Sequence, residues 1–167
     1  DNKAISSDAS AFGGALYPAA DLSQTPSAGT ISADFSNNRA LAAKSAAGGA
    51  VYIDAPDTVL AGHFENNAAV SSGGAASGGA VAAYKPLTLR NSSFNNNFAQ
   101  SQTSGFEARG GAVFAGDDLT ICADGAQTIF SDNYTLNANA DKSFNALYLS
   151  RDHLLSLQTA NGGYLRF

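Results

Sequence analysis

Short apolar segments alternate with small and polar turn residues along most of the chain. After paired glycines the sequence reads ALY, AVYI, AVAAY and AVFA, and before a recurring phenylalanine it reads TVLAGHF, LTLRNSSF and, with an insertion, DLTI to QTIF. Apolar and polar residues alternate in LTL and LTI, as is typical of a strand with one buried face. No apolar stripe recurs at helical spacing. Each repeat therefore predicts two β-strands, and we expect almost no α-helix.

Two short motifs interleave with a period near 30 residues. Gly-Gly-Ala begins at Gly13, Gly48, Gly78 and Gly110, and Phe-x-x-Asn begins at Phe35, Phe64, Phe94 and Phe130. SFNALYL at 143–149 aligns with AGGAVYI at 47–53 as a degenerate copy without its glycines. Repeats of this length with strand signals indicate a β-solenoid. We predict an all-β fold, a single-stranded, right-handed parallel β-helix of about five to seven coils.

Stacked coils place equivalent residues above one another, about 4.8 Å apart. The motif phenylalanines are therefore expected to form an internal stack of rings, and the last motif residues (Asn38, Asn67, Asn97 and Asn133) a ladder of side-chain amides. The glycine pairs are expected to allow a tight bend and to leave room beside the ring stack; their second members are Gly14, Gly49, Gly79 and Gly111. The motif residues are thus predicted to maintain the fold rather than to bind.

The segments between the motifs predict a different role. ALAAKSAA, AAVSSGGAAS and FAQSQTSGFEAR are small, polar and variable in length. We expect them to be loops that project from one corner of the coil, where binding residues are more common than in a repeated scaffold.

The chain divides into three parts. Residues 1–12 predict an amino-terminal cap or the start of a coil, 13–133 the motif-bearing coils, and 134–167 further coils of the same β-helix. The sequence YLRF at the end reads as a strand, so we expect a truncated solenoid that continues beyond Phe167.

The charge and cysteine content of the chain limit the classes of partner and the cysteine chemistry that we expect. Only 14% of the residues are charged and the net charge is −5, which disfavours nucleic acid as a partner. The single cysteine, Cys122, excludes an internal disulfide, and its strand context predicts a buried, unreactive thiol.

Charged side chains were considered as a catalytic or metal site. The candidates are Asp54, Asp57, Asp117 and Asp118 in comparable turns, Glu107 with Arg109, and Arg151-Asp152-His153. Asp117 and Asp118 could act as an acid–base pair or bind calcium, but a solvated turn is the preferred interpretation. His63 and His153 lie far apart in sequence, so neither a zinc site nor a nucleophilic triad is indicated. We expect no enzyme activity, no catalytic residue, no metal and no cofactor.

The interleaved motifs resemble those of the chlamydial polymorphic membrane proteins and of related Gram-negative autotransporter passengers. The matching segments span roughly 13–133: GGAL (13–16), GGAV (48–51, 78–81, 110–113), FSNN (35–38), FENN (64–67), FNNN (94–97) and FSDN (130–133). The resemblance implies a right-handed parallel β-helix on the bacterial surface. It also implies anchorage to the outer membrane through a carboxyl-terminal barrel absent from this sequence, and adhesion to host cells.

On this basis we expect a non-catalytic adhesin segment that binds a host-surface protein or glycan. Tyr52, Tyr84 and Phe106 are candidate receptor contacts because aromatic side chains are favoured interface anchors, although each is equally compatible with a core position. Self-association of the chain through exposed strand edges at the coil ends is a further alternative. The alternatives are a structural stalk that holds a separate binding tip, and a carbohydrate-active β-helix that uses the aspartate turns.

Overall fold

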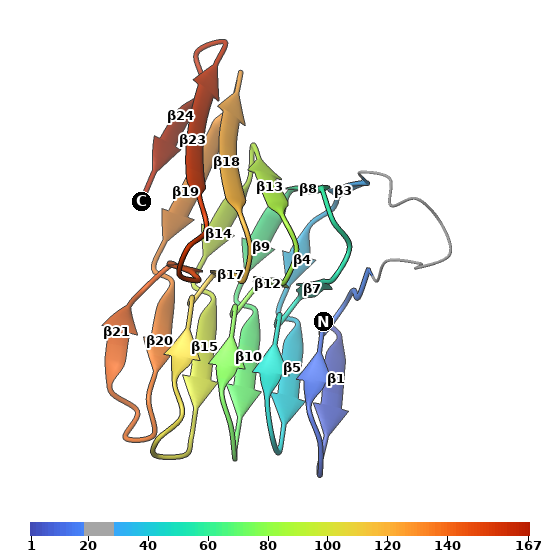
Figure 1. The fold of residues 1–167 in the computed structure, drawn as a ribbon, viewed down its shortest axis with the longest axis vertical. Coiled ribbons are helices and arrows are strands. Elements are labelled where there is room, and N and C mark those ends of the chain that lie inside the picture. The colour runs from blue at the N-terminus through green and yellow to red at the C-terminus, as the bar shows by residue number, and fades with distance from the viewer. Residues whose placement is uncertain (19–28) are drawn as a thin grey trace.

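The protein is a parallel β-solenoid of about five turns (Figure 1). The computed structural model describes residues 1–18 and 29–167, and within those residues it contains strands and no helix. In particular, none of the described segments forms a helix long and apolar enough to cross a membrane. The prediction of an all-β parallel solenoid is confirmed.

Each complete coil contains five short strands, so the prediction of two was an undercount. Equivalent strands form five sheets that run along the rod, numbered I to V in the order in which one coil meets them. Sheet I contains β1 (Lys3–Ser6), β5 (Arg39–Ala42), β10 (Ala68–Ser71), β15 (Phe98–Ser101), β20 (Tyr134–Leu136) and β21 (Lys142–Phe144). Sheet II contains β2 (Ala11–Phe12), β6 (Ala46–Ala47), β11 (Ala76–Ser77) and β16 (Ala108–Arg109).

Sheets III to V complete each coil. Sheet III contains β7 (Val51–Ile53), β12 (Val81–Ala83), β17 (Val113–Ala115) and β22 (Leu147–Leu149). Sheet IV contains β3 (Thr30–Ser32), β8 (Thr58–Ala61), β13 (Leu87–Arg90), β18 (Leu119–Asp124) and β23 (Leu155–Ala160). Sheet V contains β4 (Phe35–Ser36), β9 (His63–Glu65), β14 (Ser93–Asn95), β19 (Gln127–Ser131) and β24 (Tyr164–Arg166).

The segments expected to be projecting loops begin instead as strands of sheet I. ALA, AAVS and FAQS fall within β5, β10 and β15, which pair in parallel and in register. Their small residues alternate with larger ones, and the small ones point into the coil: Ala40, Ala42 and Ala69 are buried in one cluster with Ala46 of sheet II. The interior here is too narrow for large side chains, so these strands lack the hydrophobic pattern that identifies a buried strand.

At each glycine pair the two sides of the coil approach closely and form a narrow waist, which divides the interior into two lobes. Sheets I and II enclose a small lobe with the alanine cluster, and sheets III to V enclose a large lobe with a core of Phe, Leu, Ile and Val. Gly48 has a φ of +64°. A Cβ on Gly49 would lie 2.0 Å from the carbonyl oxygen of Gly79 in the next coil and 2.5 Å from the carbonyl carbon of Ala68 on the opposite side of the same coil. The second glycines therefore make room for the backbone of the next coil and of the opposite side of the waist, not for the phenylalanine rings as the sequence suggested.

The predicted phenylalanine stack is confirmed. The ring centroids of Phe35, Phe64, Phe94 and Phe130 are 5.0, 4.7 and 4.8 Å apart in order, and successive planes differ by 14° or less. Phe167 continues the stack, 5.4 Å from Phe130. Parallel register brings these rings together, because β4, β9, β14 and β19 pair Phe to Phe.

The predicted asparagine ladder is also confirmed. The Asn97 Oδ1 accepts hydrogen bonds from both the backbone N–H and the Nδ2 of Asn67, each at 3.0 Å. The second Nδ2 proton of Asn67 goes to the Phe35 carbonyl at 2.9 Å. Asn97 repeats the whole pattern with Asn133 and the Phe64 carbonyl. At the ends of the ladder, Asn38 donates to Asn67 Oδ1, Asn133 donates to the Phe94 carbonyl, and Asn2 donates to Asn38 Oδ1. Each buried amide is satisfied only because another coil lies beside it.

The residue before each ladder asparagine makes the turn. Asn37, Asn66, Asn96 and Asp132 have φ values between 52° and 59°, the left-handed conformation that Asn and Asp tolerate best among residues with a side chain.

The two ends of the chain join the same sheets. Residues 1–12 contain β1 and β2, which pair with β5 and β6, so this segment starts a coil. At the other end, Leu147 pairs with Val113 as the alignment of 143–149 predicted. The last strand of sheet I, β21, pairs antiparallel with β20.

We predict that Phe64→Ala destabilises the protein by about 3 to 5 kcal/mol, because a fully buried ring is lost from the middle of the stack. Phe106→Ala, which removes an exposed ring, should change stability by less than about 0.5 kcal/mol. Urea unfolding followed by circular dichroism measures both. Equal stability of Phe64→Ala and wild type would contradict the role given to the stack.

Candidate binding surface

Six aromatic rings form a continuous column on the outside of the solenoid, where sheet II meets sheet III. Phe12 and Tyr17 both contact Tyr52, and Tyr84, Phe114 and Tyr148 follow in order; the centroids of contacting rings are 4.8 to 5.4 Å apart. We call this the aromatic column; its members are Phe12, Tyr17, Tyr52, Tyr84, Phe114 and Tyr148.

Register explains most of the column. Tyr52, Ala82, Phe114 and Tyr148 occupy equivalent positions, one residue after the Val or Leu that begins each strand of sheet III. Ala82 leaves a gap, and Tyr84, two residues further on, fills it with its ring 5.3 Å from both Tyr52 and Phe114. At the carboxyl-terminal end, the Arg109 guanidinium lies 5.0 Å from the Tyr148 ring centroid.

The structure therefore brings together two of the three candidate contacts and separates the third. Tyr52 and Tyr84 touch, whereas Phe106 lies in the segment before β16, where it lines a small surface pocket of about 190 Å³ with Asn137 and Ala138. Phe12, Tyr17, Phe114 and Tyr148 were missed. Four of the five copies carry an aromatic residue directly after the Leu or Val that follows the glycine pair or its equivalent, which is the signal that could have identified the column.

The rings of the column differ in exposure. Neighbouring rings cover one another, so Tyr17 and Tyr84, 50% and 41% exposed, are the members most available to a partner. Burial, with further contributions from Tyr84, Tyr17 and Asp54, raises the pKa of Tyr52 from 10.0 to about 12. Burial also raises the pKa of Tyr84. Tyr52 accordingly supports the column, and its more exposed neighbours Tyr17 and Tyr84 offer ring surface and hydroxyl groups to a partner.

A group of two carboxylates and an imidazole lies in the turns that lead into sheet IV. His153 Nδ1 is 3.3 Å from Asp117 Oδ1 and 3.5 Å from Asp118 Oδ1. The sequence predicted Asp117-Asp118 and Arg151-Asp152-His153 as two separate candidate groups. Stacking of adjacent coils places His153 beside both aspartates. These three side chains are the one group of metal-ligating type within residues 1–18 and 29–167.

Both carboxylates in that group also hold the turns. Asp117 Oδ1 accepts the backbone N–H of Asp118 at 2.8 Å, and Asp118 Oδ1 accepts the backbone N–H of Leu154 at 2.9 Å. These hydrogen bonds and the contacts with His153 connect one coil to the next. The carboxylates therefore stabilise the two turns rather than form an open metal-coordination site.

The remaining charged candidates are dispersed. Asp57 has a φ of +52° and forms a tight turn before β8. Asp54 lies two coils from Asp117, a separation of about 10 Å along the rod. Glu107 pairs with Arg109 at 2.8 Å, and His63 contacts the Ser93 hydroxyl in sheet V.

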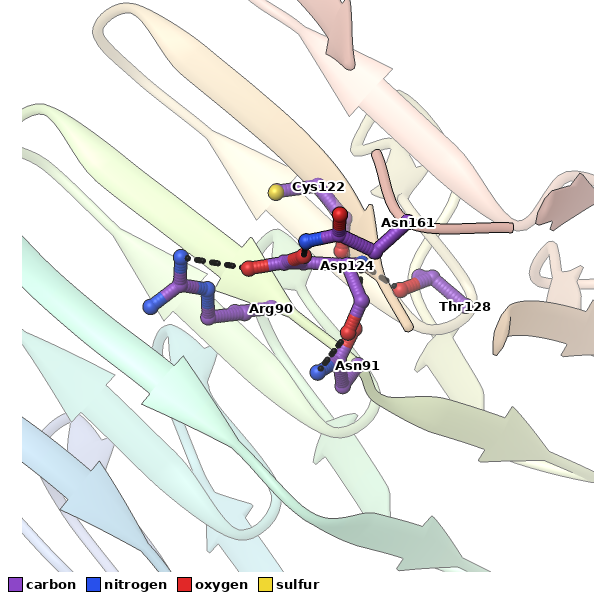
Figure 2. Close-up of polar contacts among 6 residues, drawn as sticks. All are labelled: Arg90, Asn91, Cys122, Asp124, Thr128 and Asn161. Carbon is purple, nitrogen blue, oxygen red and sulfur yellow. Dashed lines mark hydrogen bonds and ion pairs between the residues drawn. The ribbon is translucent and has the colours of Figure 1, made fainter. Parts of the chain in front are cut away.

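A further polar cluster occurs where sheet IV turns into sheet V (Figure 2). Asp124 binds the Arg90 guanidinium at 3.1 Å and accepts the Asn161 side-chain amide at 2.7 Å. Its backbone exchanges two hydrogen bonds with the Asn91 side chain, at 2.8 and 3.0 Å. Three successive coils are thus joined at one corner, which is a structural function.

The burial predicted for Cys122 is confirmed. The side chain is 9% exposed and alternates with the inward-facing Ile121 and Ala123, so it lies on the outer side of sheet IV rather than in the core. The Thr128 hydroxyl donates to the Cys122 carbonyl at 2.9 Å (Figure 2).

No family model, curated protein or solved structure matches this chain. Its function is therefore inferred from its own residues and surfaces.

We predict that deprotonation of Tyr52 contributes to the loss of protein stability at alkaline pH. A folded-state pKa near 12 exceeds the unfolded value of 10.0, so its contribution to stability is complete below pH 10 and is lost as the pH rises from 10 to 12. The melting temperature of Tyr52→Phe should fall less than that of wild type across that interval. Parallel losses in wild type and Tyr52→Phe would refute the assignment.

Proposed function

We propose that the chain is a surface-displayed passenger segment of a Gram-negative autotransporter and that it contributes to adhesion to host surfaces without catalysis. One observation carries the proposal: the repeated residues are used by the scaffold. The motif phenylalanines and asparagines are buried, and the glycines form the waist of each coil. Repetition therefore builds a rigid rod and leaves the outward positions free to form binding surfaces.

The resemblance of the motifs supports this assignment, together with the right-handed coil that it implies. In the proposed arrangement the segment lies outside the cell and is held at the outer membrane by parts of the protein beyond this sequence. Its partner is a host-surface protein or glycan.

The aromatic column is the proposed contact surface. Tyr17 and Tyr84 are its most exposed members, and rings that are fixed by their neighbours lose little conformational freedom when a partner binds. Phe106, half exposed on a separate segment, is a second contact.

A structural stalk is the main alternative, because a rod with stacked rings and amides would also serve as a rigid spacer. The carbohydrate-active alternative has weaker support, since Asp117 and Asp118 already bind backbone N–H groups and His153.

We predict that beads coated with the folded chain attach to epithelial cells better than beads coated with heat-denatured chain. Tyr84→Ala should weaken attachment about fivefold, the effect of losing roughly 1 kcal/mol of an interface anchor. Thr120→Ala, on the outer side of sheet IV, is the matched control, and melting curves verify that both variants are folded.

Attachment no better than that of the denatured chain would contradict the adhesin proposal and favour the stalk. Release of reducing sugar from a panel of glycans would contradict it in favour of the enzyme.

A further inference from the structure

The outer side of sheet I inverts the usual distribution of side chains. Alanines and serines point inward, and larger apolar residues point outward. The outward side chains form two columns in register. The first column is Lys3, Arg39, Ala68, Phe98, Tyr134 and Phe144; the second is Ile5, Leu41, Val70, Gln100, Leu136 and Lys142. Ala68 is fully buried and interrupts the accessible surface of the first column. We call this surface the apolar face.

Several of these side chains remain accessible. Ile5 is 67% exposed and Phe144 is 75% exposed, while Leu41, Val70 and Leu136 are partly buried; Leu41 and Val70 are adjacent, and Gln100 separates Val70 from Leu136. Ile5, Leu41 and Val70 line a shallow groove of about 260 Å³, whose other wall includes Ser72 and Gln102. A contiguous exposed apolar surface of this kind marks an interaction site more often than isolated exposed residues do.

The charges on the apolar face have one sign. The six strands of sheet I contain Lys3, Arg39 and Lys142 and no Asp or Glu, although the chain as a whole carries a net charge of −5. The Lys142 ammonium lies 3.9 Å from the Tyr134 ring centroid and 4.7 Å from that of Phe144, so it is held above the aromatic end of the face. A partner that matches this surface carries apolar side chains flanked by carboxylates.

The length and width of the apolar face match those of a single α-helix from a partner. Five interstrand gaps give a length of about 24 Å, and four residues of strand give a width of about 13 Å, or roughly 300 Å². A folded partner normally buries about 800 Å² on each side, whereas an α-helix is about 10–12 Å wide. The helical pitch of about 5.4 Å also approaches the rung spacing of about 4.8 Å, so successive turns can set apolar side chains between successive coils.

We propose that the apolar face binds an acidic amphipathic α-helix of a partner protein, about 16 residues long, which lies along the rod axis across the strands of sheet I. Its apolar stripe contacts Ile5, Leu41 and Val70 at one end and Tyr134 and Leu136 at the other. Its carboxylates meet Arg39 and Lys142. A second copy of this chain fits poorly, because two such faces would oppose cations with cations. The proposal does not depend on the adhesin assignment.

The test uses a fluorescein-labelled synthetic helix of about 16 residues with leucines at helical spacing and flanking glutamates. Fluorescence anisotropy with the 167-residue chain should show saturable binding that weakens as salt increases. Two control peptides, one with the glutamates replaced by lysines and one with the same residues in strict apolar–polar alternation, should bind at least about tenfold more weakly.

Variants then locate the site. Val70→Asp and Arg39→Glu should each weaken binding about tenfold or more, while Thr88→Asp, on the outer side of sheet IV, should leave it unchanged. Arg39 is exposed, so Arg39→Glu keeps the test decisive if Val70→Asp fails to fold.

Three results would overturn the proposal. The first is absence of peptide binding, or equal binding of the control peptides. The second is binding to vesicles of phosphatidylcholine and phosphatidylglycerol that Val70→Asp or Arg39→Glu abolishes, because the face would then be a lipid-binding surface. The third is a dimer in analytical ultracentrifugation that the same variants dissociate, because the face would then join two copies of this chain.

Discussion

The close approach of backbone to backbone at the waist controls the shape of every coil. The second glycine of each pair lies against both the next coil and the residue that follows the motif asparagine: a Cβ on Gly79 would lie 2.0 Å from the carbonyl oxygen of Gly111 and 2.5 Å from the backbone nitrogen of Phe98. Closure at this point buries Asn97, whose amide then depends on Asn67, Asn133 and the Phe64 carbonyl. The two motifs therefore recur together because closing one coil creates hydrogen-bonding groups that the neighbouring coils must satisfy.

The same constraint determines which side chains reach the surface. The waist divides the interior into a large lobe that accommodates the phenylalanine stack and a small lobe with room for alanine and serine. In sheet I the larger apolar residues consequently face outward. The aromatic column forms beside the waist, where sheet II turns into sheet III. Both surfaces are consequences of coil geometry, and side chains can change there without loss of the internal ladders.

Much of the scaffold was predictable because stacking converts sequence periodicity into spatial contact. Phe64, Phe94, Asn67 and Asn97 recur at equivalent positions, so their ladders followed from the repeat alone. Sheet I was not predicted, since Ala40, Ala69 and Ser71 mark an interior by small size rather than by hydrophobicity. The contacts of His153 with Asp117 and of Tyr84 with Phe114 depend on register across repeats of unequal length, and the candidate site was therefore predicted only in part.

The central claim is that the second glycine of each pair is required for closure of the waist, and Gly79→Ala tests it most directly. Gly79 does not have a positive φ, so alanine there introduces the backbone clash without the strain of a left-handed conformation. Gly29→Ala is the control, because a Cβ on Gly29 meets nothing within 4 Å. Thermal unfolding followed by circular dichroism should show a large loss of melting temperature or of β structure for Gly79→Ala and none for Gly29→Ala. A Gly79→Ala protein that melts cooperatively at the wild-type temperature would contradict the account.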